Sequence, residues 1–394
     1  MVWSALWFGL VAGLQASLIA AQGDNATAIK QACDDIESQF SDASDVLTFQ
    51  GIRFHKAIDH WMESSDQTPQ CVVKPASAQD LSTAMRIIGE RGVPFAVMSG
   101  GHTSNPGFSS TTGVHISLQN LNEISLSQNG STARIGFGNK WLDVYKKLEG
   151  SGRNVVGGRV PGPGVGGFTL GGGYSWKTNL YGLTIDTVKS FTLVCPNGTI
   201  TTVDQSRPDL FFALRGGLNR FGVVADAELY THSQVPLIYG GTRLYDSTQV
   251  DKIAVSAEAE VCSTAVFRLG KLPRAPTGIN LAVDAYIPGL YGQHAAADTS
   301  YPHSDSQLPV LLDVAWAFSA DDDYWRRQVR QSRDTLAQLA QEEGILHPIS
   351  YSNYAQGNTP AAQLYGSENA VRLAQIRNGV DPQRIMDLTG GYVI

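Results

Sequence analysis

The feature that most constrains this chain is a glycine-rich run over residues 157–173, which reads GGRVPGPGVGGFTLGGG. Nine of these 17 residues are glycine and two are proline, so no regular helix or strand is expected within the run. Such a segment exposes backbone N–H groups and allows close approach to a ligand. A second glycine turn, Ser99-Gly100-Gly101-His102, follows a predicted buried strand over 93–98. Ligands bind at such places, beyond the carboxyl ends of strands in α/β sheets.

The glycine spacing narrows the choice of nucleotide. Gly162, Gly164 and Gly167 spell G-x-G-x-x-G, with Asp186 about 20 residues further on, as in a Rossmann fingerprint. However, Pro163 lies inside the pattern and the following FTLGGGYSW is not expected to open a helix, so a nicotinamide site is disfavoured. The sequence contains no Walker A motif, no G-x-S-x-G and no H-E-x-x-H. Two glycine loops whose amides can face a diphosphate, one of them presenting a histidine, favour FAD.

Composition excludes several other classes of protein. The 394 residues are 42% apolar and 16% charged, which excludes a disordered chain and is enough for two or three domains. The formal charge is −7 and there is no run of Lys or Arg, so a general nucleic-acid binder is disfavoured.

The first 21 residues carry no charged side chain and predict a secretory signal peptide. A retained membrane anchor and a hydrophobic N-terminal helix are the alternatives. No later stretch is apolar enough to span a bilayer, so we expect no membrane association after signal removal and a location in the secretory lumen or outside the cell. Three sequons mark candidate glycosylation sites, at Asn25, Asn129 and Asn197.

The chain has four cysteines without zinc or C-x-x-C spacing. In an oxidising compartment Cys33 and Cys71 could form a disulfide, and four free thiols are the alternative.

A strand–helix–strand unit precedes the first glycine turn. The strand over 71–74 ends at a proline, Ser77 is the expected N-cap of the next helix, and Gly92 is its expected end. The other expected strands lie near 114–118, 123–127, 132–137, 189–195, 199–203 and 223–231. The other expected helices lie near 26–39, 141–149, 209–214 and 321–343.

Several long motifs occur together in a fixed order. Val97-Met98-Ser99-Gly100-Gly101-His102 resembles the flavin loop of the vanillyl-alcohol oxidase superfamily. The accompanying motifs are PGVGGFTLGGGYSW at 163–176, YGLTIDTV at 181–188, DLFFALRGG at 209–217, FGVV at 221–224, YSNYA at 351–355 and DPQRIMDLTGG at 381–391. With these segments the chain is similar to the fungal berberine bridge enzyme-like FAD-linked oxidoreductases, which have a p-cresol methylhydroxylase-type FAD-binding domain.

The resemblance implies roles for particular residues. His102 matches the histidine that forms an 8α covalent bond to FAD, and Val160 stands where bicovalent members carry a cysteine, so one covalent bond is expected. The expected diphosphate loop comprises Ser99, Gly100, Gly101, Thr103 and Ser104. The second wall would comprise Gly166, Gly167, Gly171 and Gly172, and the adenine side Gly222 and Val224.

The motif YSNY implies the catalytic residues. Tyr354 is the candidate base, and Tyr351 and Asn353 would position the flavin ring. A free phenol has a pKa of about 10, so Tyr354 would need a cationic or hydrogen-bonding partner to act near neutral pH.

The implied fold is α+β with two domains. The expected order is a signal peptide over 1–21, an N-terminal segment over 22–59, the FAD-binding domain over 60–235, a substrate domain over 236–354 and a returning segment over 355–394. Only 120 residues separate Tyr230 from Tyr351, fewer than the family usually spends on its antiparallel substrate sheet. We therefore expect a shortened sheet, which would leave strand edges unpaired. A trimmed domain, an exon lost from the gene model and degeneration all remain open.

The implied reaction is a two-electron oxidation of a small organic substrate, from secondary metabolism or a carbohydrate, with hydride transfer to FAD and O2 as acceptor. A flavin dehydrogenase with another acceptor and an inactive flavin-binding protein are the alternatives. The expected partners are the small substrate and O2, without nucleic acid, and the sequence does not determine the oligomeric state.

Overall fold

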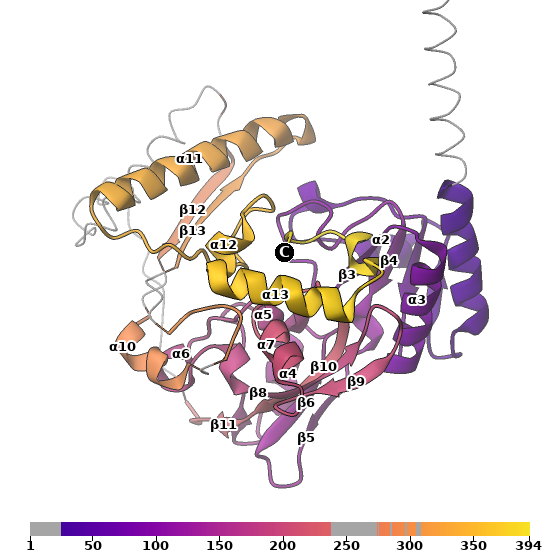
Figure 1. Cartoon of the computed structure of the whole chain (residues 1–394), viewed down its shortest axis with the longest axis horizontal. Helices are drawn as coiled ribbons and strands as arrows, with labels where there is room; N and C mark the ends of the chain where they lie inside the picture. The colour runs from indigo at the N-terminus through magenta and orange to yellow at the C-terminus, as the bar shows by residue number, and fades with distance from the viewer. Residues whose placement is uncertain (1–24, 238–273, 275, 284–285, 296–297, 305–308) are drawn as a thin grey trace, which may run out of the picture.

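The computed structural model describes residues 25–237, 274, 276–283, 286–295, 298–304 and 309–394 (Figure 1). The predicted signal peptide and Cys262 lie outside the described residues, as does the beginning of the predicted substrate domain.

The first sheet delivers the first glycine turn. Its strand order is β1 (Asp45–Leu47), β2 (Cys71–Lys74), β4 (Val114–Ser117) and β3 (Phe95–Met98), with β2, β4 and β3 parallel. Helix α3 (Ala78–Arg91) connects β2 to β3. The Ser77 side chain accepts from the Asp80 amide, and Gly92 ends the helix at φ +61°, so the predicted cap and stop are confirmed.

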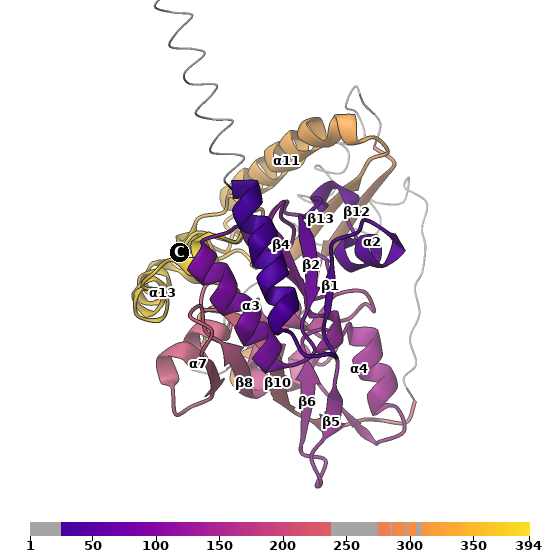
Figure 2. The same ribbon diagram turned by 90° about the vertical axis from the view of Figure 1, so that its right-hand side faces the viewer.

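The second sheet is antiparallel. Its order is β5 (Ile124–Leu126), β6 (Thr132–Gly136), β10 (Val223–Tyr230), β8 (Val188–Val194) and β9 (Ile200–Val203). Helix α3 packs against β8 and β9, so it joins the two sheets around one core (Figure 2). Other helices and short strands are α2 (Ile52–Ile58), α4 (Trp141–Leu148), α6 (Thr178–Tyr181), α7 (Pro208–Leu214), α10 (Pro288–Tyr291), α12 (Ala361–Tyr365), β7 (Arg153–Asn154) and β11 (His232–Ser233).

One expectation about the glycine-rich run is wrong. Helix α5 (Val165–Leu170) forms inside it, although the composition predicted no regular structure there. Its apolar side is anchored by Val165 and Leu170, which are buried in the main core. Tertiary packing therefore outweighs the low helix propensity of its two glycines. Gly171 ends the helix after six residues.

The described part of the predicted substrate domain forms a small roof. Strands β12 (Gly278–Val283) and β13 (Val310–Ala315) pair antiparallel, and helix α11 (Asp322–Glu342) lies over them (Figure 1). Trp325 of α11 is fully buried against Val314 of β13. Within the described residues, the expected substrate sheet is thus represented by two strands.

The C-terminal segment packs against α7 and the first sheet. Helix α13 (Ser367–Val380) packs against α7, and the Leu388 carbonyl accepts from the Phe95 amide of β3. The buried Arg220 guanidinium donates to the carbonyls of Met386, Thr389, Gly391 and Tyr392. These bonds fix the chain end beside the first sheet.

The expected disulfide is present. Cys33 lies on the helix over 25–39, which runs beside α3, and is bonded to Cys71 at the start of β2 (Figure 2). Within the described residues Cys195 is a free thiol. No helix of the described chain combines the length and the hydropathy needed to cross a bilayer.

Candidate functional site

A cavity of about 2440 Å³ lies between the two glycine loops and the roof. Its walls include the first glycine turn, the second glycine loop, β13 and the inner face of α11. Of the predicted site residues, those that line it are Ser99, Gly100, Gly101, His102, Thr103, Ser104, Gly166, Gly167, Gly222, Val224, Tyr351, Asn353 and Tyr354.

The two glycine loops touch backbone to backbone. A Cβ on Gly100 would lie 2.2 Å from the Gly164 amide nitrogen, and a Cβ on Gly164 would lie 2.2 Å from that of Gly100. Ser99 joins the same two loops, since its Oγ accepts from the Gly166 amide at 3.1 Å and donates to the Phe137 carbonyl at 2.5 Å. Glycine is therefore required where the loops cross, which explains one part of the sequence pattern.

His102 stands at the end of the first turn. Its ring stacks on Trp61, with centroids 4.9 Å apart and planes 14° apart, and the Trp61 amide is held by the Gly101 carbonyl. Gly162 of the second glycine loop lies next to this ring, since a Cβ on Gly162 would be 3.6 Å from His102 Nε2. Burial lowers the pKa of His102 below 6.5, so the ring is neutral at neutral pH. A neutral, oriented imidazole is the form that can act as a nucleophile.

The Tyr351–Tyr354 motif is docked on the second glycine loop. The Tyr351 hydroxyl accepts from the Gly173 amide at 3.1 Å and from Asn353 Nδ2 at 2.9 Å. Ser352 Oγ donates to the Gly171 carbonyl at 3.0 Å, and a Cβ on Gly171 would lie 2.2 Å from Asn353 Oδ1. Close packing of the Asn353 side chain against the Gly171 backbone, rather than loop flexibility, is what favours glycine here.

Gly171 and Gly172 are buried in the contact with the YSNY motif. A Cβ on Gly172 would lie 3.1 Å from the Tyr351 ring. Gly167 differs, because a Cβ there would meet nothing within 4 Å, and its backbone borders the cavity. The second wall thus has an open part at Gly167 and a packed part at residues 171–172.

Sequence reasoning missed Arg159. Its Nη2 donates to the Tyr354 hydroxyl at 2.5 Å, and its guanidinium lies 5.6 Å from the Tyr286 ring centroid. The two residues are 195 positions apart, and no local pattern marks this arginine as a partner.

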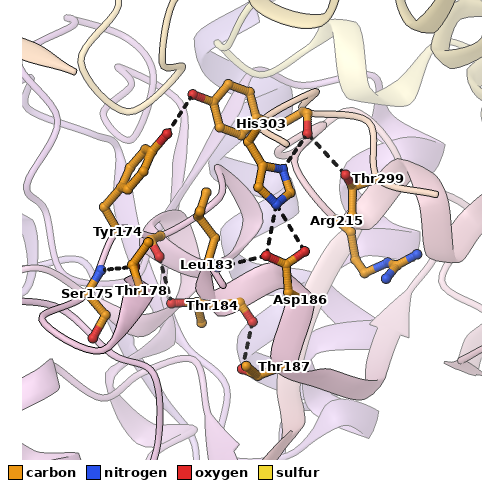
Figure 3. A network of polar contacts seen from close by, with 12 residues as sticks. Tyr174, Ser175, Thr178, Leu183, Thr184, Asp186, Thr187, Arg215, Thr299 and His303 are labelled. Carbon is orange, nitrogen blue, oxygen red and sulfur yellow. Dashed lines mark hydrogen bonds and ion pairs between the residues drawn. The ribbon is translucent and has the colours of Figure 1, made fainter. Parts of the chain in front are cut away.

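A buried ion pair between Asp186 and His303 lies next to the tyrosines that pack against the YSNY motif (Figure 3). His303 Nε2 lies 2.8 Å from Asp186 Oδ2, and both side chains are 1% exposed. His303 Nδ1 lies 2.8 Å from the Tyr301 carbonyl, and the Tyr301 ring contacts that of Tyr351. Although burial alone would lower the pKa of His303, the Asp186 carboxylate raises it above 6.5. Asp186 stands where a Rossmann fingerprint would place its acidic residue. In this structure its carboxylate is instead buried in an ion pair with His303.

The residues present fit a dinucleotide. The cavity exceeds the usual range for small-ligand pockets, about 300–1,000 Å³. The crossing at Gly100 and Gly164 leaves no room for side chains, and Gly167 offers an unobstructed backbone face. Gly222, which also lines the cavity, has φ +130°, and a Cβ there would lie 2.3 Å from the Val194 carbonyl. Backbone walls of this kind suit the diphosphate of a dinucleotide such as FAD.

Residues 69–204 match the model of a family described as an FAD binding domain. FAD-dependent monooxygenase tpcD from Cochliobolus heterostrophus is 41% identical over 442 residues, covering 83% of this chain and 85% of that protein. The chain belongs to this family of fungal FAD-linked oxidoreductases. The tpcD alignment is longer than the 394 residues of the chain, so tpcD carries residues that have no counterpart here.

Other members of the family match over a shorter span. FAD-dependent monooxygenase yanF from Aspergillus niger is 42% identical over 277 residues, which are 65% of this chain and 46% of yanF. The match to macF from Penicillium terrestre covers 45% of this chain and 36% of macF. The chain therefore spans about half the length, or less, of these two relatives.

Solved structures confirm the fold. The xylooligosaccharide oxidase of Myceliophthora thermophila has a TM-score of 0.72 at 19% identity, with 93% of this chain and 100% of that chain covered. The glucooligosaccharide oxidase of Acremonium strictum has a TM-score of 0.71 at 17% identity, with 93% and 98% covered. The expected α+β fold of vanillyl-alcohol oxidase type is thus confirmed, and so is the resemblance on which it was based.

Proposed function

We propose that this family member oxidises a small organic molecule by two electrons, with FAD as cofactor and O2 as final acceptor. The observation that carries the proposal is the convergence of two glycine loops, His102 and Tyr354 on one cavity. Secondary metabolism, the expectation from the fungal family, remains the proposed source of the substrate.

The first turn, Gly167 and the Gly222–Val224 segment would hold the dinucleotide through backbone groups. When bound, FAD supplies the two-electron acceptor that takes a hydride and passes the electrons to O2, giving H2O2. His102 would hold the cofactor by one covalent bond, supported by its neutral ring and its fixed orientation against Trp61. Val160 lines the cavity without a thiol, in keeping with a single covalent link.

Tyr354 is the proposed base. Its phenol oxygen would take the proton, as a general base, from an O–H or N–H beside the oxidised C–H. Complete burial raises the pKa of Tyr351 above 10.0, so this second phenol is poorly suited to the same task. Tyr351 and Asn353 instead fix the motif on the glycine loop.

A second candidate is a flavin-binding protein without turnover. It is favoured by the two described roof strands and by the stretch of tpcD that has no counterpart here. The carbohydrate-oxidase and dehydrogenase alternatives differ from the proposal in substrate or acceptor. H2O2 release under air, with cellobiose and with benzyl alcohol as donors, separates them.

A secretory location and glycosylation remain part of the proposal. The buried disulfide supports an oxidising compartment. Asn25, Asn129 and Asn197 are exposed, as acceptor sites must be. A shift in mass on treatment with an endoglycosidase tests these sites.

The experiment that tests the proposal is acid denaturation of the expressed chain, followed by in-gel flavin fluorescence. Flavin is expected to stay with the wild-type polypeptide and to wash off His102→Ala. The matched control is His55→Ala, because His55 is an exposed histidine of α2 outside the cavity lining. A folded but colourless wild type would overturn the flavoenzyme proposal, and flavin retained by His102→Ala would overturn the covalent link.

A further inference from the structure

The phenol of Tyr354 is paired with a guanidinium from the second glycine loop. Arg159 Nη2 donates to Tyr354 Oη at 2.5 Å. Both residues line the cavity, and both are partly exposed to it. The second glycine loop therefore brings a permanent cation to Tyr354, the phenol of the YSNY motif that reaches the cavity without complete burial.

The position of Arg159 is fixed by its neighbours in the chain. A Cβ on Gly157 would lie 2.4 Å from the Trp141 ring, and the Tyr145 hydroxyl donates to the Gly158 carbonyl at 2.6 Å. Two residues of helix α4 thus hold the backbone just before Arg159. The guanidinium also lies over the Tyr286 ring, a contact that restricts its rotamers further.

The chemistry of the pair is directional. Arginine has donors and no acceptor, so the Tyr354 oxygen must accept in this bond. When the phenol is neutral, its own proton must therefore be directed to a group other than Arg159. When the phenol is ionised, the same bond becomes a charge-assisted one and strengthens.

We propose that Arg159 is a positioning residue that stabilises the phenolate of Tyr354 and thereby makes it a base near neutral pH. The inference rests on the proposed oxidase function and deepens it. An opposite charge at this range typically favours the charged form by about 1–3 pKa units. No cofactor is needed for this effect, so it can be measured apart from turnover.

Phenol side chains of the same aromatic cluster also surround Tyr354. Among the described residues, the phenols packed with it are Tyr351, Tyr174, Tyr286, Tyr291 and Tyr301. The Tyr351 ring meets the Tyr354 ring edge-on at 4.8 Å, and it is neutral at neutral pH because burial raises its pKa. Arg159 contributes a positive charge in direct hydrogen-bond contact with Tyr354.

The test is a difference titration of phenolate absorbance in the purified full chain. Subtracting the titration curve of Tyr354→Phe from that of wild type isolates the titration of Tyr354. Subtracting the curve of the double variant Arg159→Gln/Tyr354→Phe from that of Arg159→Gln isolates the same titration without the arginine. Glutamine retains a hydrogen-bond donor but carries no charge, so it separates charge from geometry. Lys177→Met is the matched control, since Lys177 is a partly buried cation next in sequence to Trp176, which lines the cavity.

The Tyr354 midpoint is expected to rise by about 1–3 pH units in Arg159→Gln and to stay in place in Lys177→Met. Arg159→Lys should restore most of the shift, because the charge remains. An unchanged midpoint in Arg159→Gln, or an equal rise in Lys177→Met, would overturn the inference. Should Arg159→Gln fold poorly, judged by circular dichroism, Arg159→Met gives the same comparison.

The activity readout then separates the two proposals. With a donor that reduces the flavin, the acid limb of kcat/KM should move to higher pH in Arg159→Gln, with a smaller change in KM. If wild type holds flavin but neither benzyl alcohol nor cellobiose reduces that flavin, the result counts against the oxidase proposal. The phenolate titration still decides the role of Arg159.

Discussion

Adding one methyl group at Gly100 should separate the two glycine loops. Gly100→Ala places a Cβ 2.2 Å from the Gly164 amide nitrogen and 2.4 Å from its Cα. Gly100 has an ordinary backbone φ, so alanine meets no conformational penalty and the effect is purely steric. Gly167→Ala adds the same group to the facing loop, where nothing lies within 4 Å.

The magnitude follows from this geometry. Non-bonded carbon contacts are comfortable at about 3.5–4.0 Å, so the loops would have to part by roughly 1 Å or more. The atoms in the way belong to backbone, which cannot rotate aside as a side chain can. Overpacking of this kind costs about 1–3 kcal/mol, and a domain of 150–250 residues loses about 2–4 °C of Tm per kcal/mol. Several degrees should therefore be lost in Gly100→Ala, with little change in Gly167→Ala.

Thermal unfolding and flavin content per polypeptide measure the two consequences. Gly100→Ala should melt earlier and elute with less flavin, because Ser99 could no longer reach both Phe137 and Gly166. An unchanged Tm in Gly100→Ala would refute the backbone crossing. An equal loss of Tm in both variants would show that any methyl group on these loops is harmful, which also contradicts the argument.

The remaining predictions concern stability. His303→Leu should lower the free energy of unfolding by about 3–5 kcal/mol, because Asp186 would lose its buried partner. Since Asp186 raises the folded-state pKa of His303 above 6.5, the stabilisation is complete below pH 6.5 and is lost as pH rises through the folded pKa, so urea titrations should show the gap to wild type narrowing. A gap that widens would contradict this sign. Replacing Cys33 and Cys71 together by Ala should cost about 2–5 kcal/mol, and wild type in dithiothreitol should melt like the variant.

The sequence predicted the elements whose signals are local. Ser77 and Gly92 mark both ends of α3, and the strands expected near 189–195 and 199–203 are present as β8 and β9. The first glycine turn follows β3 directly, as a ligand loop at a strand end should. These elements can be predicted from the sequence because the hydrogen bonds that define them join residues only a few positions apart.

The parts that could not be predicted depend on distant partners. Helix α5 forms because Val165 and Leu170 reach a core assembled from the whole domain. The Arg159–Tyr354 bond and the Asp186–His303 pair join residues 195 and 117 positions apart. Glycine content indicated close approach correctly, but it did not distinguish approach to a ligand from approach to another backbone. At Gly100 the partner is the Gly164 backbone, and at Gly171 it is the Asn353 side chain, so neither glycine is explained by a ligand.

A short roof need not remove the proposed base. The YSNY motif is held by the Gly171 carbonyl, the Gly173 amide and the Tyr392 hydroxyl, which donates to the Ser352 carbonyl at 2.7 Å. All three groups belong to the glycine loop or to the C-terminal segment, and none belongs to β12, β13 or α11. Loss of roof strands therefore leaves Tyr354 opposite Arg159 while it widens the cavity above them. Substrate specificity, rather than the position of the base, is the property that a shortened roof should change.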